Sequence, residues 1–162
     1  MQAGDVVEDF ALHNQDGREV RLSELKAAPV VLFFYPRADT PGCTIESCGF
    51  RDAFERFQAA GITVRGISRD TVKAQKKFKE KYGLPYDLLA DPEMVLIKRF
   101  DLLKEKTMYG KPVTGVERTT YLIGRADADG QQRLLHVFAK VKPEGHADEV
   151  LALVAGQAKA TR

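Results

Sequence analysis

The feature that most constrains the fold of this chain is the continuous apolar run VVLFFY at residues 30–35. The run is rich in β-branched and aromatic residues and has no polar residue to face solvent. Such a pattern predicts a strand that is buried on both faces of its sheet. Both faces must then be covered by other layers, which favours an α/β architecture.

The rest of the chain alternates between helical and strand patterns. Apolar spacing and capping residues predict helices over residues 41–60, 71–82, 92–100 and 146–158, and further strands over residues 63–68, 119–123 and 134–138. Asp70 and Asp91 are expected to cap the second and third helices. Residues 102–115 and 124–132 are expected to be loops. This order predicts a mixed sheet flanked by helices, with the first two strands parallel and the last two forming an antiparallel hairpin.

Composition is typical of a globular domain without an obvious charged partner. The chain has 162 residues, 44% hydrophobic and 30% charged, with a net charge of +2. These values predict a single domain over residues 1–162 and give no general reason to expect nucleic-acid or membrane binding. No apolar run approaches the ~20 residues of a spanning helix. The acidic start, with Asp5, Glu8 and Asp9, does not resemble a signal or transit peptide, so a cytoplasmic location is expected.

The segment most informative about function follows the buried strand directly and reads PRADTPGCTIESC, from Pro36 to Cys48. Thr40 is a good helix N-cap and Pro41 suits the first helical position, which places Cys43 in the third. The N–H groups of an opening turn have no partner within the helix, and the helix dipole favours an anion there. A thiolate at Cys43 is therefore favoured. Gly42 is expected to leave room for a small substrate.

Cys48 lies five residues further along the same expected helix. In an ideal helix such a pair has Cα atoms roughly 8–9 Å apart, whereas a disulfide tolerates no more than about 7 Å. A bond between Cys43 and Cys48 would therefore require the first turns of the helix to unwind. Simple burial of the cysteines and a zinc site using the scattered His13, His136 and His146 are weaker alternatives, and the spacing differs from a C-x-x-C motif.

The pattern Pro36-x-x-x-Thr40-x-x-Cys43 resembles the active-site signature of the peroxiredoxins. The neighbouring residues resemble the bacterioferritin-comigratory-protein, or PrxQ, subfamily, and the similarity extends along almost the whole chain. It is carried by the motifs FYP at 34–36, TPGCT at 40–44, CGFRD at 48–52, YGLP at 82–85, MYGK at 108–111, RTTYLI at 118–123 and KPEGH at 142–146.

This resemblance implies a thioredoxin-like fold and a thiol peroxidase without a metal or other cofactor. It implies that Cys43 is the peroxidatic cysteine and Cys48 the resolving one. Thr40 would hydrogen-bond the peroxide and the thiolate, Pro36 would shield the site, and Arg118 would stabilise the thiolate. The implied partners are a hydroperoxide and a thioredoxin or glutaredoxin-type reductant, and the subfamily favours a monomer.

Other residues are less informative on their own. An Arg before a strand, such as Arg118, is commonly a solvated surface residue, and so is a mid-helix Glu such as Glu46. The three histidines have no catalytic spacing. Met108 and Tyr109 suit a substrate face or a plain loop equally. A peroxide sensor and a non-catalytic interaction module with two buried thiols remain the alternative functions.

Overall fold

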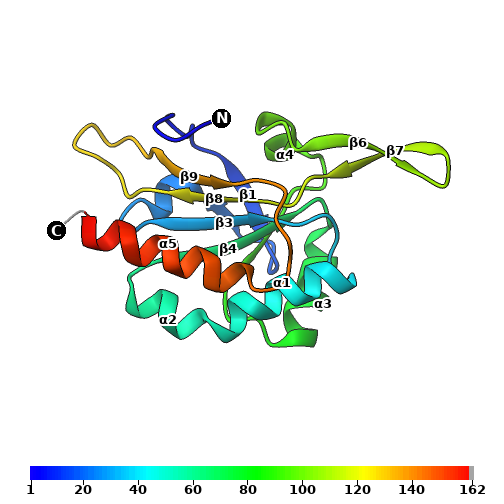
Figure 1. The fold of residues 1–162 in the computed structure, drawn as a ribbon, viewed down its shortest axis with the longest axis horizontal. Coiled ribbons are helices and arrows are strands. Elements are labelled where there is room, and N and C mark those ends of the chain that lie inside the picture. The colour runs from blue at the N-terminus through cyan, green and yellow to red at the C-terminus, as the bar shows by residue number, and fades with distance from the viewer. Residues whose placement is uncertain (161–162) are drawn as a thin grey trace.

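A seven-stranded mixed sheet forms the centre of the protein in the computed structural model, which describes residues 1–160 except for the side chains of Lys106, Met108 and 155–160 (Figure 1). The strand order is β2-β1-β5-β4-β3-β8-β9. The strands are β1 (Ala11–Asn14), β2 (Glu19–Arg21), β3 (Val30–Phe34), β4 (Thr63–Ser68), β5 (Leu88–Ala90), β8 (Thr119–Ile123) and β9 (Leu134–Phe138).

The expected central strands are confirmed in place and direction. β3 pairs in parallel with β4 and antiparallel with β8, and β8 pairs antiparallel with β9. Every residue of β3 is buried, as the apolar run predicts. The short strands β1, β2 and β5 were not expected. β1 and β2 each have a single buried apolar residue, and β5 is only three residues long, so no clear period marks them.

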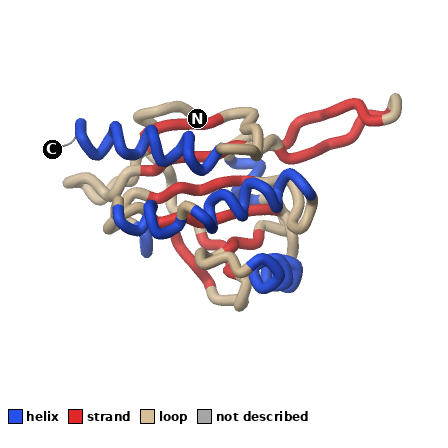
Figure 2. The backbone as a smooth tube through the Cα atoms, turned by 60° about the horizontal axis from the view of Figure 1, so that its bottom comes forward, coloured by secondary structure: helices blue, strands red, loops and turns tan. Residues whose placement is uncertain are grey.

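Helices cover the two faces of the sheet unequally (Figure 2). Four helices pack against the face that carries Val31 and Phe33. These helices are α1 (Pro41–Asp52), α2 (Phe54–Ala59), α3 (Val72–Tyr82) and α5 (His146–Ala160). The other face is covered by the 3-10 helix η1 (Leu22–Leu25), the short α4 (Val95–Arg99) and the N-terminal segment. The sheet is thus the middle layer of three.

The expected continuous helix over residues 41–60 is two helices. Ala53 has φ −94° and ψ 0°, and it ends α1 and precedes α2. Phe50 and Phe57, on either side of this break, are both fully buried, with ring centroids 5.7 Å apart. The apolar spacing continues through the break because both helices pack on the same face of the sheet, so sequence periodicity alone cannot reveal it.

The expectation of a loop over residues 102–115 is wrong. β6 (Leu103–Met108) and β7 (Lys111–Val116) form an antiparallel hairpin that extends away from the sheet (Figures 1 and 2). Tyr109 and Gly110 form its turn, with φ of +54° and +75°, as a two-residue hairpin turn requires. Most of β7 is exposed on both faces. Without a buried face, the hairpin has no apolar alternation for sequence analysis to detect.

Two expected caps also differ in detail. Thr71, not Asp70, is the N-cap of α3, and its hydroxyl accepts from the Ala74 N–H. Asp91 lies four residues before α4, yet its carboxylate accepts from the N–H groups of Val95, Leu96 and Ile97. Asp91 therefore accepts hydrogen bonds from the N–H groups of the opening turn of α4, although Met94 is at the N-cap position.

No helix within residues 1–160 is both long and apolar enough to cross a membrane.

Candidate active site

The start of α1 follows the C-terminal end of β3 after the loop of residues 35–40, next to the centre of the sheet. Thr40 takes the extended N-cap conformation and Pro41 the first helical position, so Cys43 is in the third, as expected. The Thr40 hydroxyl donates to the carbonyl of Arg37, 2.8 Å away, and does not cap the helix. The N–H groups of Gly42 and Cys43 have no hydrogen bond within the described part of the chain.

The loop before α1 is fastened by contacts with the β4–α3 region. Asp39 has a φ of +59°, and its carboxylate accepts from the Lys81 ammonium and the Tyr82 hydroxyl. These hydrogen bonds lower the pKa of Asp39. The N–H of Ala38 donates to Asp70, 2.7 Å away. Asp70 thus holds the active-site loop instead of capping a helix, and Pro36 lies partly buried between β3 and this loop.

Arg118 joins the site from the residue before β8, the strand that pairs antiparallel with β3. Its Nη2 lies 3.4 Å from the Sγ of Cys43, and its Nη1 donates to Oε1 of Glu46 at 2.8 Å. Cys43 is only 1% exposed. Burial opposes the charge of Arg118, but Glu46 and Cys43 outweigh that effect and raise its pKa. Arg118 is therefore not a solvated surface residue, and its charge lies beside the thiol.

Gly42 leaves room for the guanidinium of Arg118, whereas the sequence suggested that it leaves room for a substrate. A Cβ at residue 42 would lie 3.1 Å from Nη2 of Arg118 and 3.5 Å from Cγ of Pro143. Such a contact is closer than side chains ordinarily tolerate without moving. The space beside Gly42 is thus occupied by the guanidinium, not reserved for substrate alone.

Glu46 and His146 belong to this cluster, and the expectation that Glu46 is a solvated residue is wrong. Glu46 is 1% exposed, and its Oε2 has no hydrogen-bond partner. His146, at the start of α5, is equally buried, and its Nε2 lies 4.0 Å from that oxygen. The signal for Glu46 was its i, i+3 spacing from Cys43, which places both on one helical face. His146 had no comparable signal, because it comes from a distant element.

Burial shifts the pKa values of these two residues in opposite directions. Desolvation raises the pKa of Glu46 to about 7, although the charge and hydrogen bond of Arg118 act against this shift. Desolvation, helped by the positive charge of Arg118, lowers the pKa of His146 to about 4. Shifts of this size are common where buried groups take part in chemistry.

Cys48 is placed further along α1 and is partly exposed. Both cysteines are free thiols in this structure. The intervening helix is regular from Pro41 to Asp52, so the structure represents the helical form of this segment. Within the described residues there is no group of three or more His, Cys, Asp or Glu side chains that could hold a metal ion.

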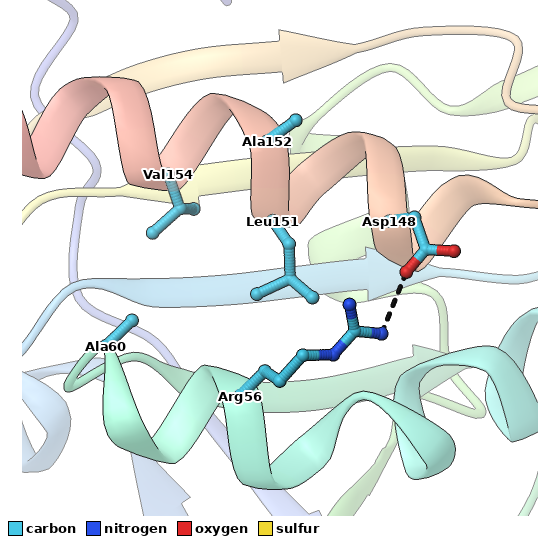
Figure 3. Close-up of a pocket in the computed structure, with 6 residues that line it drawn as sticks. All are labelled: Arg56, Ala60, Asp148, Leu151, Ala152 and Val154. Carbon is cyan, nitrogen blue, oxygen red and sulfur yellow. Dashed lines mark hydrogen bonds and ion pairs between the residues drawn. The ribbon is translucent and has the colours of Figure 1, made fainter.

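Two surface grooves help to locate the site. One, of about 700 Å³, lies between α3 and the loop before α1, and its lining includes Arg37, Ala38 and Asp39. The other lies between α2 and α5, where Arg56 and Asp148 form an ion pair of 2.9 Å across it (Figure 3). Only the first groove includes residues of the loop that precedes Cys43.

Comparison with known proteins shows similarity along nearly the whole chain. The AhpC/TSA family model matches residues 3–128. The chain is 41% identical to a putative peroxiredoxin Bcp of Coxiella burnetii, covering 93% of this chain and 97% of that protein. It is 39% identical to peroxiredoxin Bcp of Escherichia coli, covering 93% and 94%.

Solved structures give the same result. The bacterioferritin comigratory protein of Xanthomonas campestris, described for its alkyl peroxide reduction activity, matches with a TM-score of 0.83 and 38% identity over 92% of each chain. A C47S mutant of PrxQ from Xylella fastidiosa matches with a TM-score of 0.89 and 36% identity over 98% of each chain. With its mixed sheet and flanking helices, the chain therefore belongs to the AhpC/TSA family, as a thioredoxin-fold thiol peroxidase of the Bcp and peroxiredoxin Q group of peroxiredoxins.

Proposed function

We propose that Cys43 is the peroxidatic cysteine of this peroxidase. The observation that carries the proposal is the contact of 3.4 Å between its buried Sγ and the guanidinium of Arg118, at the opening turn of α1. A positive charge and free N–H groups around one sulfur favour its thiolate, which is the nucleophilic form. No other cysteine of the chain has this environment, because Cys48 lies deeper in the helix and is partly exposed.

In the first step, the Cys43 thiolate attacks the terminal oxygen of a hydroperoxide. The O–O bond breaks, the sulfur becomes a sulfenic acid, and the departing oxygen takes up a proton to leave as water or an alcohol. Negative charge develops on the departing oxygen. Arg118 and the free N–H groups of Gly42 and Cys43 are placed to stabilise it.

Thr40 and Pro36 complete the site in this proposal. The Thr40 hydroxyl is fixed at the N-cap by its bond to the Arg37 carbonyl. A hydroxyl that donates one hydrogen bond keeps two lone pairs, so Thr40 can accept from the peroxide in this position. Pro36 lies two residues after the end of β3 and limits water access to the thiolate. The proposed substrates are hydrogen peroxide and organic hydroperoxides.

In the second step, the Cys48 thiol attacks the sulfenic sulfur of Cys43, and water leaves as the disulfide forms. The regular helix from Pro41 to Asp52 keeps the two sulfurs apart, so its first turns must unwind. Unwinding exposes the disulfide to an external dithiol, a thioredoxin or glutaredoxin-type protein, which reduces it by exchange. We further propose that the chain acts as one domain and as a monomer in the cytoplasm, where such reductants keep thiols reduced.

Peroxide consumption by single-cysteine variants tests these assignments. Cys43→Ser is expected to abolish consumption. Cys48→Ser is expected to reduce one equivalent of peroxide per chain and then stop when thioredoxin and its reductase are the only reductants. Normal turnover of Cys48→Ser under these conditions would contradict the resolving role, and full activity of Cys43→Ser would contradict the peroxidatic role.

A further inference from the structure

Glu46 has one satisfied and one unsatisfied carboxylate oxygen. Oε1 accepts from Arg118 at 2.8 Å, whereas Oε2 is buried without a partner. A buried anion with a bare oxygen is costly, and an orphaned polar atom in a native interior calls for an explanation. A protonated carboxyl changes this situation, because Oε2 then carries a hydrogen that it can donate.

The polar atom facing Oε2 is Nε2 of His146, at 4.0 Å. The imidazole packs edge-on against Phe50 and Phe138, with ring centroids 5.7 and 5.4 Å away, so its orientation is fixed by aromatic neighbours. Its Nε2 also contacts the Thr120 hydroxyl at 2.7 Å. A hydroxyl both donates and accepts, so this contact suits either tautomer of the ring. An unprotonated Nε2 has a single lone pair, so it can accept from Glu46 only when the Thr120 hydroxyl gives up this contact.

The other ionisable groups around the pair come from every neighbouring element. Cys43 and Cys48 share α1 with Glu46, Arg118 precedes β8, and Tyr86 donates its hydroxyl hydrogen to the carbonyl of Ser47. Glu149 is on the far side of the imidazole, 3.9 Å from Nδ1 and largely exposed. A hydrogen on Nδ1 thus faces a carboxylate at the surface, which leaves Nε2 as the acceptor towards Glu46.

We propose that His146 is a positioning residue for the peroxidase reaction: its Nε2 accepts a hydrogen bond from protonated Glu46, which leaves the charge of Arg118 to the Cys43 thiolate. The proposal rests on the peroxidatic role of Cys43. A shift of about 1 Å, in which Nε2 exchanges the Thr120 hydroxyl for the Glu46 carboxyl, brings Oε2 and Nε2 within hydrogen-bond distance. Burial acts in the same direction, since it raises the pKa of Glu46 to about 7 and lowers that of His146 to about 4.

The proton balance of this arrangement is simple. Cys43 and Glu46 compete for the single positive charge of Arg118, which contacts both. When the proton moves from the thiol to Oε2, the S–H bond breaks, an O–H bond forms, and the total charge of the three side chains is unchanged. By accepting a hydrogen bond from that O–H group, His146 favours the state in which the sulfur, not the carboxyl, is the anion. Interacting sites of this kind titrate as a group.

The test is a titration of the Cys43 thiolate by its ultraviolet absorbance, in a Cys48→Ser background so that only one cysteine contributes. The matched variants are His146→Gln, whose amide oxygen reaches about as far as Nε2, and His146→Asn, whose amide ends near the position of Nδ1. We expect the Cys43 thiolate in His146→Gln to titrate with the same pH midpoint as in the protein with His146. We expect His146→Asn to raise it by about one pH unit, which is a tenfold loss of thiolate below the midpoint.

The decisive comparison adds Glu46→Gln, which imitates the neutral carboxyl. In that background His146→Asn should leave the thiolate midpoint unchanged, because a glutamine at residue 46 does not ionise and therefore exchanges no proton with Cys43. The proposal would be overturned if His146→Asn shifted the thiolate midpoint equally with and without Glu46→Gln. It would also be overturned if His146→Asn did not shift the midpoint at all. A lower midpoint in His146→Asn would also overturn it, by showing that Nε2 donates to ionised Glu46.

These results are independent of catalytic turnover. Failure of the proposed function would appear as a titration step that survives Cys43→Ser, or as a slow peroxide reaction of the unsubstituted chain. Failure of the role of His146 would leave both of those results intact.

Discussion

Arg118 holds the central position at the scale of single residues, because one guanidinium contacts both the thiol of Cys43 and the carboxylate of Glu46. Its planar fork matches this geometry, with Nη1 on one partner and Nη2 on the other. A buried ion pair of this kind contributes little net stability, since desolvation offsets most of the attraction. The pairing is therefore better explained by the reactivity of the sulfur than by folding.

Arg118→Lys tests whether the planar shape of the guanidinium, and not only its charge, is needed. Lysine keeps the charge but cannot contact two partners in a plane, so we expect the second-order rate with hydrogen peroxide to fall about 10- to 100-fold. Stopped-flow measurement of the first oxidation gives this rate directly. Arg125→Lys, at an exposed position, serves as the control and should react as the unsubstituted chain does. A rate for Arg118→Lys within twofold of that control would show that charge alone suffices.

Gly42→Ala tests the close approach of Arg118 to the start of α1. Alanine in a helix is ordinarily more stabilising than glycine by up to about 1 kcal/mol. Here, however, its Cβ would lie 3.1 Å from the guanidinium. We therefore expect slower reaction with peroxide and an unchanged or higher unfolding temperature. A lower temperature together with normal reactivity would mean that the backbone, not Arg118, absorbs the added methyl group.

At the scale of elements, the proposed roles of the two cysteines require an α1 that is stable enough to activate Cys43 and unstable enough to release it. Its opening turn presents free N–H groups to the sulfur, and the same turns must unwind before Cys48 can reach it. Glu46 lies between the two cysteines, so unwinding also removes the buried carboxyl from Arg118 and His146. The burial of Glu46 in the helical form is thus linked to disulfide formation.

Gly49→Ala shifts this balance without touching the reacting groups. The added Cβ would lie 3.7 Å from Cβ of Ala147, which is an ordinary contact. Stabilising α1 by up to about 1 kcal/mol should slow disulfide formation by up to about fivefold. The rate of the first oxidation should stay the same and is the internal control. Faster disulfide formation in this variant would contradict the need for unwinding.

The sequence predicted the elements with strong periodicity or clear end signals. The buried strand β3, the start of α1 at Pro41, and the strands β4, β8 and β9 were all expected where they are. The hairpin of β6 and β7 was missed because it has no buried face. The burial of Glu46 and His146 was missed for another reason: it is a property of the assembled helices, and residue type alone suggests solvent exposure for both.

At the scale of the whole molecule, the sheet brings distant parts of the chain to one sulfur. β3 places the loop of Pro36 and Thr40, β8 places Arg118, and α5 places His146. The groove beside the loop, of about 700 Å³, lies at the same end of the sheet. The site therefore requires the complete fold, and fragments of the chain should lack its reactivity.

The buried pair Glu46 and His146 should also shape the dependence of stability on pH. Glu46 has a raised pKa of about 7 in the folded state, so its contribution is lost as pH rises from about 4.5 to 7. His146 has a lowered pKa of about 4, so its contribution is lost as pH falls from about 6.5 to 4. Between pH 4.5 and 6.5 the two slopes oppose each other, because one proton is on Glu46 when folded and on His146 when unfolded.

Denaturant unfolding across this range provides the measurement. Relative to the unsubstituted chain, Glu46→Gln should gain stability as pH rises from about 4.5 to 6.5, and His146→Asn should lose it. Each slope should be below about 1.4 kcal/mol per pH unit, the value for one full proton. Parallel curves for all three proteins would contradict the assigned protonation states.

The most direct test of the account is to follow the two cysteines through a single reaction. One equivalent of hydrogen peroxide is added to the reduced protein, the reaction is quenched at short times, and intact and peptide masses are recorded. We expect a loss of two hydrogens and a peptide linking Cys43 to Cys48, formed orders of magnitude faster than free cysteine is oxidised. An unchanged mass on the timescale of free cysteine would contradict it, because the thiolate of Cys43 would then not be activated by its surroundings.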